Sequence, residues 1–388
     1  MNRLYLLFCL CLMLRPSASS QVLRDNNFSY LYNPDEPFSV GTICYRENEK
    51  LYFYFSFSIK GTRSISEFGF GAELRESLSV KEGTPLPDPE WLVYTEASRC
   101  GRILLPEGSV GRVAVLRITL AAARKPWLVY TPVPEKNAFA LLRNNQPVVE
   151  KYISINQPVT FAGFYPGKPL IVSVYRTDFP PASPPFSETQ ARVPPRIIPD
   201  EIFSHNPSEP LSFSKAGLVL VQQDTASAEG LAFRIEDDYP RFTTLSSLAG
   251  PMIYICQKKE IDRLYASAGS KPDFDKTILS ILGNAERAKI FMRSYFQRVE
   301  QANRMFTSYK AGWKTDRGMI YIIFGPPDEV FLPGNREIWE YRQATHKERF
   351  TFVRAPTLFD PDNFVLLREG RYRNTWYEVV DLWRKARF

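Results

Sequence analysis

Three carboxylates beside turns in the last third of the chain could carry out acid–base chemistry. Asp316, Asp328 and Glu329 lie within YKAGWKTDRGMIYIIFGPPDEV, residues 309–330. Two carboxyl groups held about 5 to 10 Å apart can hydrolyse a glycosidic bond. Turns also collect Asp, Gly and Pro for structural reasons, and local hydrogen bonds satisfy carboxylates there. We therefore favour a structural role and assign no catalytic residue, with a glycan or cell-wall hydrolase as the alternative hypothesis.

Other familiar catalytic and metal-binding arrangements lack residues in this sequence. The chain has only two histidines, His205 and His346. It contains no P-loop, no dinucleotide-binding glycine fingerprint and no nucleophile elbow. Ser/His and Cys/His catalysis and a metal cluster are therefore not predicted, and we expect no cofactor.

The amino terminus predicts an export signal over residues 1–20. Arg3 precedes an apolar run from Leu4 to Leu14, and the small residues Ala18 and Ser20 stand where a signal peptidase cleaves. The run of eleven residues is shorter than the roughly 20 needed to span a bilayer. No later stretch is long and apolar enough to span one. We therefore expect a soluble mature protein in the periplasm or at the outer membrane.

The net charge and the number of cysteines are compatible with an exported protein. The formal charge is +7, and removal of Arg3 and Arg15 with the signal leaves 7 − 2 = +5. Because the basic residues are dispersed among nearly as many acids, nucleic-acid binding is not predicted. Cys44 and Cys100 fall in one β-rich region and could form a disulfide in an oxidising compartment. Cys256 follows an apolar stretch, which favours a buried, inert thiol.

The first half of the chain is predicted to be mainly β. In LYFYFSFSI, residues 51–59, apolar and polar side chains alternate, as in a half-buried strand. Further strands are predicted at 90–95, 112–120 and 126–131, so residues 21–148 are expected to form a β-sandwich. A second β-rich domain follows at 149–238. Its proline-rich strap, 178–200, is expected to cross the outside of that second sandwich.

Residues 239–388 are predicted to form an α+β domain. In the helix expected at 284–311, apolar side chains recur every three or four residues, and Asn284 can cap its start. Strands are predicted at 319–324, 337–342, 349–354 and 363–368, followed by a terminal helix. The whole chain is thus expected to be multi-domain, with two β-sandwich-like domains followed by an α+β domain.

The residues around the candidate carboxylates can each be assigned a structural role. Gly312 can end the long helix, Trp313 can bury its ring, and Gly318 permits a tight bend into the next element. Thr315 and Asp316 can accept hydrogen bonds from turn amides. A second turn is predicted at three further residues, Gly325, Pro326 and Pro327.

The combined motif resembles the GWxTD domain, a family of exported bacterial proteins found in groups such as the Bacteroidota. Gly312-Trp313-Lys314-Thr315-Asp316 is followed at a short spacing by Gly325-Pro326-Pro327-Asp328-Glu329. The resemblance runs from about Tyr239 to the terminal WYEVVDLWR. It implies a β-rich amino-terminal half but no established activity or ligand. From compartment and family, we expect a non-enzymatic scaffold of the cell envelope, with other exported or outer-membrane proteins as partners.

Overall fold

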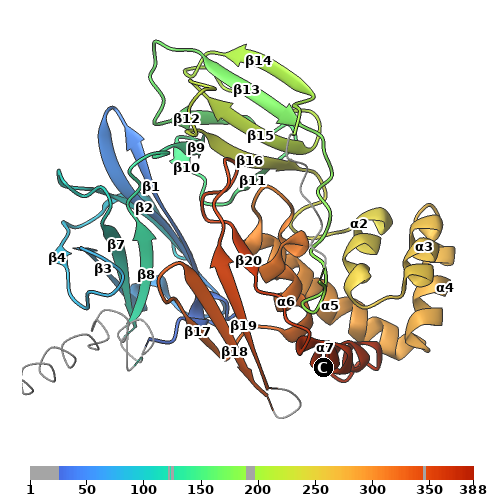
Figure 1. Ribbon diagram of the computed structural model, residues 1–388. Helices are drawn as coiled ribbons and strands as arrows, with labels where there is room; N and C mark the ends of the chain where they lie inside the picture. The colour runs from blue at the N-terminus through green and yellow to red at the C-terminus, as the bar shows by residue number, and fades with distance from the viewer. Residues whose placement is uncertain (1–25, 121–122, 124–125, 189–196, 344–346) are drawn as a thin grey trace, which may run out of the picture.

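The computed structural model describes residues 26–120, 123, 126–188, 197–343 and 347–388. The protein is mainly β in its first half and α+β in its last part, as predicted (Figure 1). The predicted signal peptide lies outside the described residues. No described helix combines the length and the apolar character needed to cross a membrane.

The first sandwich packs two four-stranded antiparallel sheets against each other. One sheet has the order β1-β2-β6-β5 and the other β4-β3-β7-β8. The predicted alternation holds, since Phe53, Phe55 and Phe57 of β2 are fully buried between the sheets. The strands are β1 (Phe38–Glu47), β2 (Lys50–Ile59), β3 (Phe68–Arg75), β4 (Thr84–Pro85), β5 (Glu90–Tyr94), β6 (Ser98–Leu104), β7 (Val113–Leu120) and β8 (Trp127–Pro132).

Cys44 and Cys100, which the sequence offered as a candidate disulfide, are both free thiols in this structure. Cys44 packs in the core between the two sheets, whereas Cys100 packs on the other face of the β1-β2 sheet beside Tyr54. The physical reason is the period of a strand, because neighbouring residues point to opposite faces. The Cys100 thiol donates to the Ser56 hydroxyl at 3.5 Å.

The second sandwich combines a three-stranded sheet, β10-β9-β12, with a five-stranded sheet, β11-β16-β15-β13-β14. A shared core joins the two sheets. Because β9 and β10 belong to it, this sandwich starts before residue 149, where sequence reasoning put its boundary. The strands are β9 (Ala140–Arg143), β10 (Gln146–Pro147), β11 (Tyr152–Ser154), β12 (Thr160–Ala162), β13 (Leu170–Tyr175), β14 (Glu201–His205), β15 (Gly217–Gln222) and β16 (Leu231–Glu236).

In the last part, helices cover a four-stranded antiparallel sheet of order β17-β18-β19-β20. The strands are β17 (Glu329–Phe331), β18 (Arg336–Arg342), β19 (Lys347–Arg354) and β20 (Phe364–Leu366). Figure 1 shows α2 to α4 projecting on one side, with α5, α6 and α7 nearer the sheet. The helices are α2 (Leu245–Ala249), α3 (Lys258–Ser267), α4 (Lys271–Leu282), α5 (Ala285–Phe306), α6 (Asp316–Phe324) and α7 (Tyr372–Arg384).

The segment MIYIIF, expected as a strand at 319–324, is instead part of helix α6. Every residue from Met319 to Phe324 is buried, so the segment has no polar face to mark its period. A short, fully apolar run fits a buried helix as well as a buried strand. The side chain of Thr315 accepts a hydrogen bond from the Gly318 amide at 3.0 Å and caps the helix.

Helix α5 follows its predicted apolar stripe but ends at Phe306, earlier than expected. Asn284 caps it, because its side chain accepts a hydrogen bond from the Arg287 amide at 2.9 Å. Gly312 does not end this helix and lies instead in a short 3-10 turn, Gly312–Lys314. The chain therefore leaves α5 and makes a separate turn before α6 begins.

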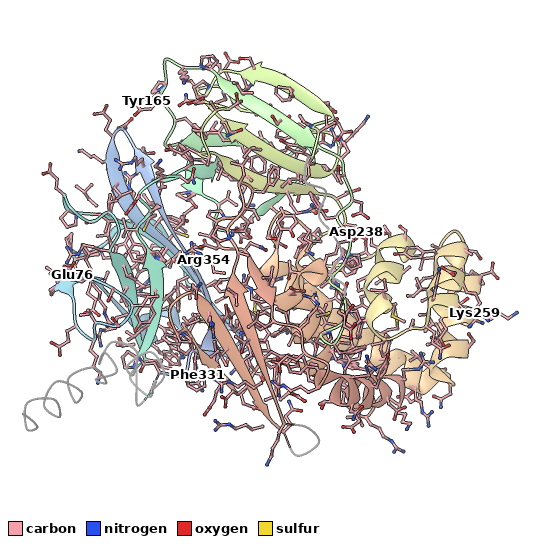
Figure 2. The ribbon with its side chains drawn as sticks, in the orientation of Figure 1. Glu76, Tyr165, Asp238, Lys259, Phe331 and Arg354 are labelled. Atoms are coloured by element: carbon pink, nitrogen blue, oxygen red, sulfur yellow. The ribbon has the colours of Figure 1, made fainter. Side chains whose placement is uncertain are left out.

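Asp238 forms the joint between the second sandwich and the helices, as Figure 2 indicates by its position. Its carboxylate accepts hydrogen bonds from the backbone and side chains of Thr243 and Thr244. Burial raises the pKa of Asp238, but these hydrogen bonds outweigh it and lower the pKa to about 2. Thr244 in turn caps helix α2.

Candidate functional site

The site is built around Asp316, the first residue of α6. This carboxylate is only 9% exposed. Its Oδ1 accepts a hydrogen bond from Nη2 of Arg368 at 2.6 Å, and its Oδ2 accepts one from Nη1 at 3.3 Å. The backbone amide of Leu366, in β20, donates to Oδ2 at 2.8 Å. Asp316 therefore fixes the start of α6 to the last strand of the sheet.

Gly312 permits an unusually close contact between the turn and helix α5. A Cβ atom at Gly312 would lie 2.1 Å from the carbonyl oxygen of Ala302 and 2.6 Å from Cα of Asn303. Gly318 is packed as closely, because a Cβ there would lie 1.9 Å from the carbonyl oxygen of Gly312. The hydroxyl of Thr315 donates to that same carbonyl at 2.8 Å. These residues close the turn tightly on itself.

Trp313 is buried, as predicted, and both of its backbone groups are bonded. Its amide donates to Oδ1 of Asn303 at 3.0 Å, and its carbonyl accepts from the Tyr254 hydroxyl at 2.8 Å. Asn303 is fully buried in α5, and its amide nitrogen donates to the Pro240 carbonyl at 2.9 Å. Sequence reasoning missed Asn303, although its polar side chain beside the apolar stripe was the available signal.

A second buried ion pair lies next to the motif. Arg317 donates to Oε2 of Glu337 at 3.1 Å, and Glu337 is 2% exposed. The other oxygen of Glu337 accepts from the Tyr32 hydroxyl at 2.5 Å and from the Trp339 indole at 2.7 Å. The two carboxylates therefore connect α6 to β18, β20 and the segment near the amino terminus.

The proline-rich strap packs on the outer face of the second sandwich, as expected, through Phe179 and Ile197. It also crosses this motif. The Ala182 amide donates to the Lys314 carbonyl at 2.9 Å. Arg368 donates to the Ser183 carbonyl at 3.1 Å while it holds Asp316. Residues 189–196 of the strap lie outside the described residues. The part before this gap, 178–188, is therefore held by the same arginine that holds the motif.

Lys310 lies under the strap close to the ion pair. Its ammonium donates to the Pro180 carbonyl at 3.4 Å. Burial lowers the pKa of Lys310 to about 8, against the opposing attraction of Asp316.

The second turn is built differently from the first. Gly325 has a φ of +86°, and a Cβ there would lie 3.0 Å from the Arg298 guanidinium. Pro326 and Pro327 follow and lead the chain into β17. Asp328 is exposed, and its Oδ2 accepts from the Arg342 amide at 2.6 Å. Glu329 pairs with Arg342 at 2.5 Å.

The structure places the three candidate carboxylates at different ends of α6. Asp316 opens α6, whereas Asp328 and Glu329 follow its end. Asp316 is bonded to Arg368, whereas Asp328 and Glu329 are bonded to Arg342, and no hydrogen bond or ion pair among the described residues joins the two groups. The described residues also contain no group of His, Cys, Asp and Glu side chains that could hold a metal ion.

No curated protein matches the chain. Among solved structures, the chain is similar to a crystal structure of DIP-gamma IG1+IG2, with 10% identity over 52% of this chain and 97% of that one. The TM-score is 0.17, which is too low to support an argument about fold or function.

The GWxTD domain family matches residues 217–385. The match begins at β15, earlier than the Tyr239 that the sequence resemblance suggested, so it takes in the last two strands of the second sandwich. It includes the turn, α6, both buried ion pairs and α7. Residues 217–385 therefore contain a GWxTD domain.

Proposed function

We propose that this protein is a non-enzymatic interaction protein of the bacterial cell envelope, exported to the periplasm or outer membrane. The observation that carries the proposal is the use of Asp316, the most buried of the candidate carboxylates. Both of its oxygens are engaged by Arg368 and by the Leu366 amide. A carboxylate held in this way joins segments and is poorly placed to transfer protons.

The motif residues support the same conclusion. Gly312 and Gly318 provide close packing, Trp313 is bonded through its backbone, and Thr315 caps a helix. Together with Asp316 and Arg368 they join α5, α6, β20 and the strap. Such contacts suit a scaffold, because they hold segments from distant parts of the chain in place.

The open edge of the five-stranded sheet is a surface suited to a partner. Strand β14 forms that edge, and Ile202 within it is 63% exposed. Ile198, just before the strand, is 78% exposed. An exposed strand edge can pair with an extended segment of another protein, and exposed apolar side chains add contact area. We propose that an extended segment of another exported or outer-membrane protein adds to β14.

Affinity purification from envelope extracts tests this proposal. The tagged protein is cross-linked in cells, and co-purified proteins are identified and then tagged themselves for the reciprocal experiment. A stoichiometric partner that Ile202→Lys removes is the expected result. The matched control is Ile290→Lys, because Ile290 is 41% exposed on α5, away from β14.

Two outcomes would contradict the proposal. The first is the absence of any reciprocal, stoichiometric partner in periplasmic and outer-membrane fractions. The second is altered cell-wall or glycan products in a strain carrying Asp328→Asn or Glu329→Gln in a folded protein. That second outcome would favour the envelope hydrolase considered from the sequence.

A further inference from the structure

A cavity of about 770 Å³ lies between the first sandwich and helix α5. The outer face of β1 and β2 forms one wall, and Gln301, Arg304 and Met305 of α5 form the opposite wall. The segment from Tyr30 to Pro34 closes another side. No residue of the GWxTD motif lines this cavity, so it is separate from the site described above.

The cavity exists because side-chain size changes along one face of two paired strands. At one end of this face, Tyr45, Tyr52 and Tyr54 pack against the second sandwich. At the other end, the residues in register are small: Ser39 opposite Ser58, and Gly41 opposite Ser56. These four positions line the cavity where bulkier residues would fill it.

Two polar groups that line the cavity have unused hydrogen-bonding capacity. Glu150 is exposed, and its carboxylate makes no hydrogen bond or ion pair with any described residue. Gln301 uses its oxygen to accept from the Tyr321 hydroxyl at 3.3 Å, and its amide nitrogen donates to no described residue. The Glu150 carboxylate can only accept hydrogen bonds, and the Gln301 amide nitrogen can only donate them. A ligand with neighbouring hydroxyl groups can satisfy both.

The cations of the cavity are only partly engaged. Lys60 donates to the Pro34 carbonyl at 3.0 Å, and Arg304 pairs with Glu300 at 2.8 Å. Lys60 has no acidic partner among the described residues, and its ammonium keeps donors that a ligand hydroxyl can use. The tyrosines at positions 30, 32 and 152 also provide ring surfaces at the walls. Such rings pack against apolar faces while their hydroxyl ends stay polar.

We propose that this cavity binds a short, uncharged oligosaccharide. Its volume lies in the usual range of small-molecule sites. Sugar hydroxyls donate to Glu150 and accept from Gln301 and the serines, while the carbon–hydrogen faces of the rings pack on tyrosine. Because β1 is the edge strand of its sheet, an extended peptide is the competing occupant that the test below distinguishes. This proposal is independent of the β14 interaction.

The test starts with the purified protein on an array of immobilised trisaccharides of glucose, galactose, mannose and N-acetylglucosamine. The best probe is then titrated by calorimetry against wild type, Ser58→Phe and Gln301→Leu. Ser58→Phe fills the cavity, and Gln301→Leu removes the free donor. We expect each variant to raise the dissociation constant about tenfold or more, with little change in the melting temperature of the protein.

The matched control is Thr119→Phe, which adds the same ring at an exposed position of β7 in the other sheet. It should bind the trisaccharide within about twofold of wild type. An array with no bound trisaccharide overturns the proposal, as does binding that both cavity variants leave unchanged. A peptide array is run in parallel. Peptide binding that Ser58→Phe abolishes, without sugar binding, also overturns it and assigns the cavity to an extended peptide.

Discussion

Asp316 and Arg368 lie 52 positions apart in the sequence and form a buried, two-bonded ion pair. Arg368 also holds the strap through the Ser183 carbonyl, at 3.1 Å. One arginine thus links the helix that follows the GWxTD turn to the proline-rich segment from the other half of the chain. Disruption of this pair should loosen both contacts together.

Asp316→Asn removes the charge but keeps the shape of the side chain. Arg368 would then be buried without its partner, so we expect the free energy of unfolding to fall by about 3 kcal/mol. Urea unfolding followed by circular dichroism measures this loss. The control is Asp328→Asn, an exposed carboxylate of the same region, which should cost about 1 kcal/mol or less. Equal losses in the two variants would show that the Asp316 pair has no special structural role.

Gly312→Ala tests the close contact of the turn with α5. The new Cβ would lie 2.1 Å from a backbone carbonyl oxygen, so the backbone must move. We expect the free energy of unfolding to fall by about 3 kcal/mol or more, or the variant to fail to fold. Gly370→Ala is the matched control, because nothing lies within 4 Å of its Cβ position. Thermal melts of both variants compare them directly, and a melting temperature of Gly312→Ala near that of wild type would argue against the contact.

Asn303→Ala leaves the Trp313 amide and the Pro240 carbonyl without their shared partner. Because both groups lose their hydrogen bond beside a fully buried position, we expect the free energy of unfolding to fall by about 2 to 4 kcal/mol. Gln297→Ala, at an exposed position of the same helix, should change stability by about 0.5 kcal/mol or less. The measurement is chemical unfolding at one pH. A small effect of Asn303→Ala would mean that water replaces the lost side chain.

Lys310 should make stability depend on alkaline pH. Its pKa is lowered to about 8 in the folded protein, whereas an unfolded lysine has a pKa of about 10.4. Between these values the unfolded state binds more protons, so this group makes the free energy of unfolding rise with pH. We expect Lys310→Met to be more stable than wild type at pH 7, with a difference that shrinks by pH 10.

Urea midpoints at pH 7, 8.5 and 10 measure this effect as the difference between variant and wild type. Lys259→Met is the control, since Lys259 is exposed on α3, far to one side in Figure 2. Its difference from wild type should stay constant over the same range. A constant difference for Lys310→Met as well would show that the lysine is charged in both states throughout.

The free cysteines make a chemical prediction. Burial raises the pKa of Cys44 to about 12, so its thiol should react slowly with iodoacetamide at pH 8 in the folded protein. In denaturant without a reducing agent, Cys44 and Cys100 should both be alkylated, with Cys256 as the internal reference. Mass spectrometry of the peptides measures this, and alkylation that requires prior reduction would reveal a disulfide.

Some features of this protein were determined by local sequence. The alternation of LYFYFSFSI gave a strand with three buried phenylalanines, and the apolar stripe after Asn284 gave a capped helix. These patterns are readable because a polar face marks the period of the element. The GWxTD resemblance likewise rested on residues within 20 positions of one another.

Other features were decided by tertiary structure. MIYIIF is helical because it is surrounded by protein and has no solvent-facing side to distinguish a helix from a strand. Cys44 and Cys100 are apart because the pairing of three strands put them on opposite faces of one sheet. Asp316 could be recognised from its motif, but its partner Arg368, its contact with β20 and the strap above it depend on segments far away in the chain. Local sequence carries no record of such distant contacts, since they form only when burial of the whole core brings those segments together.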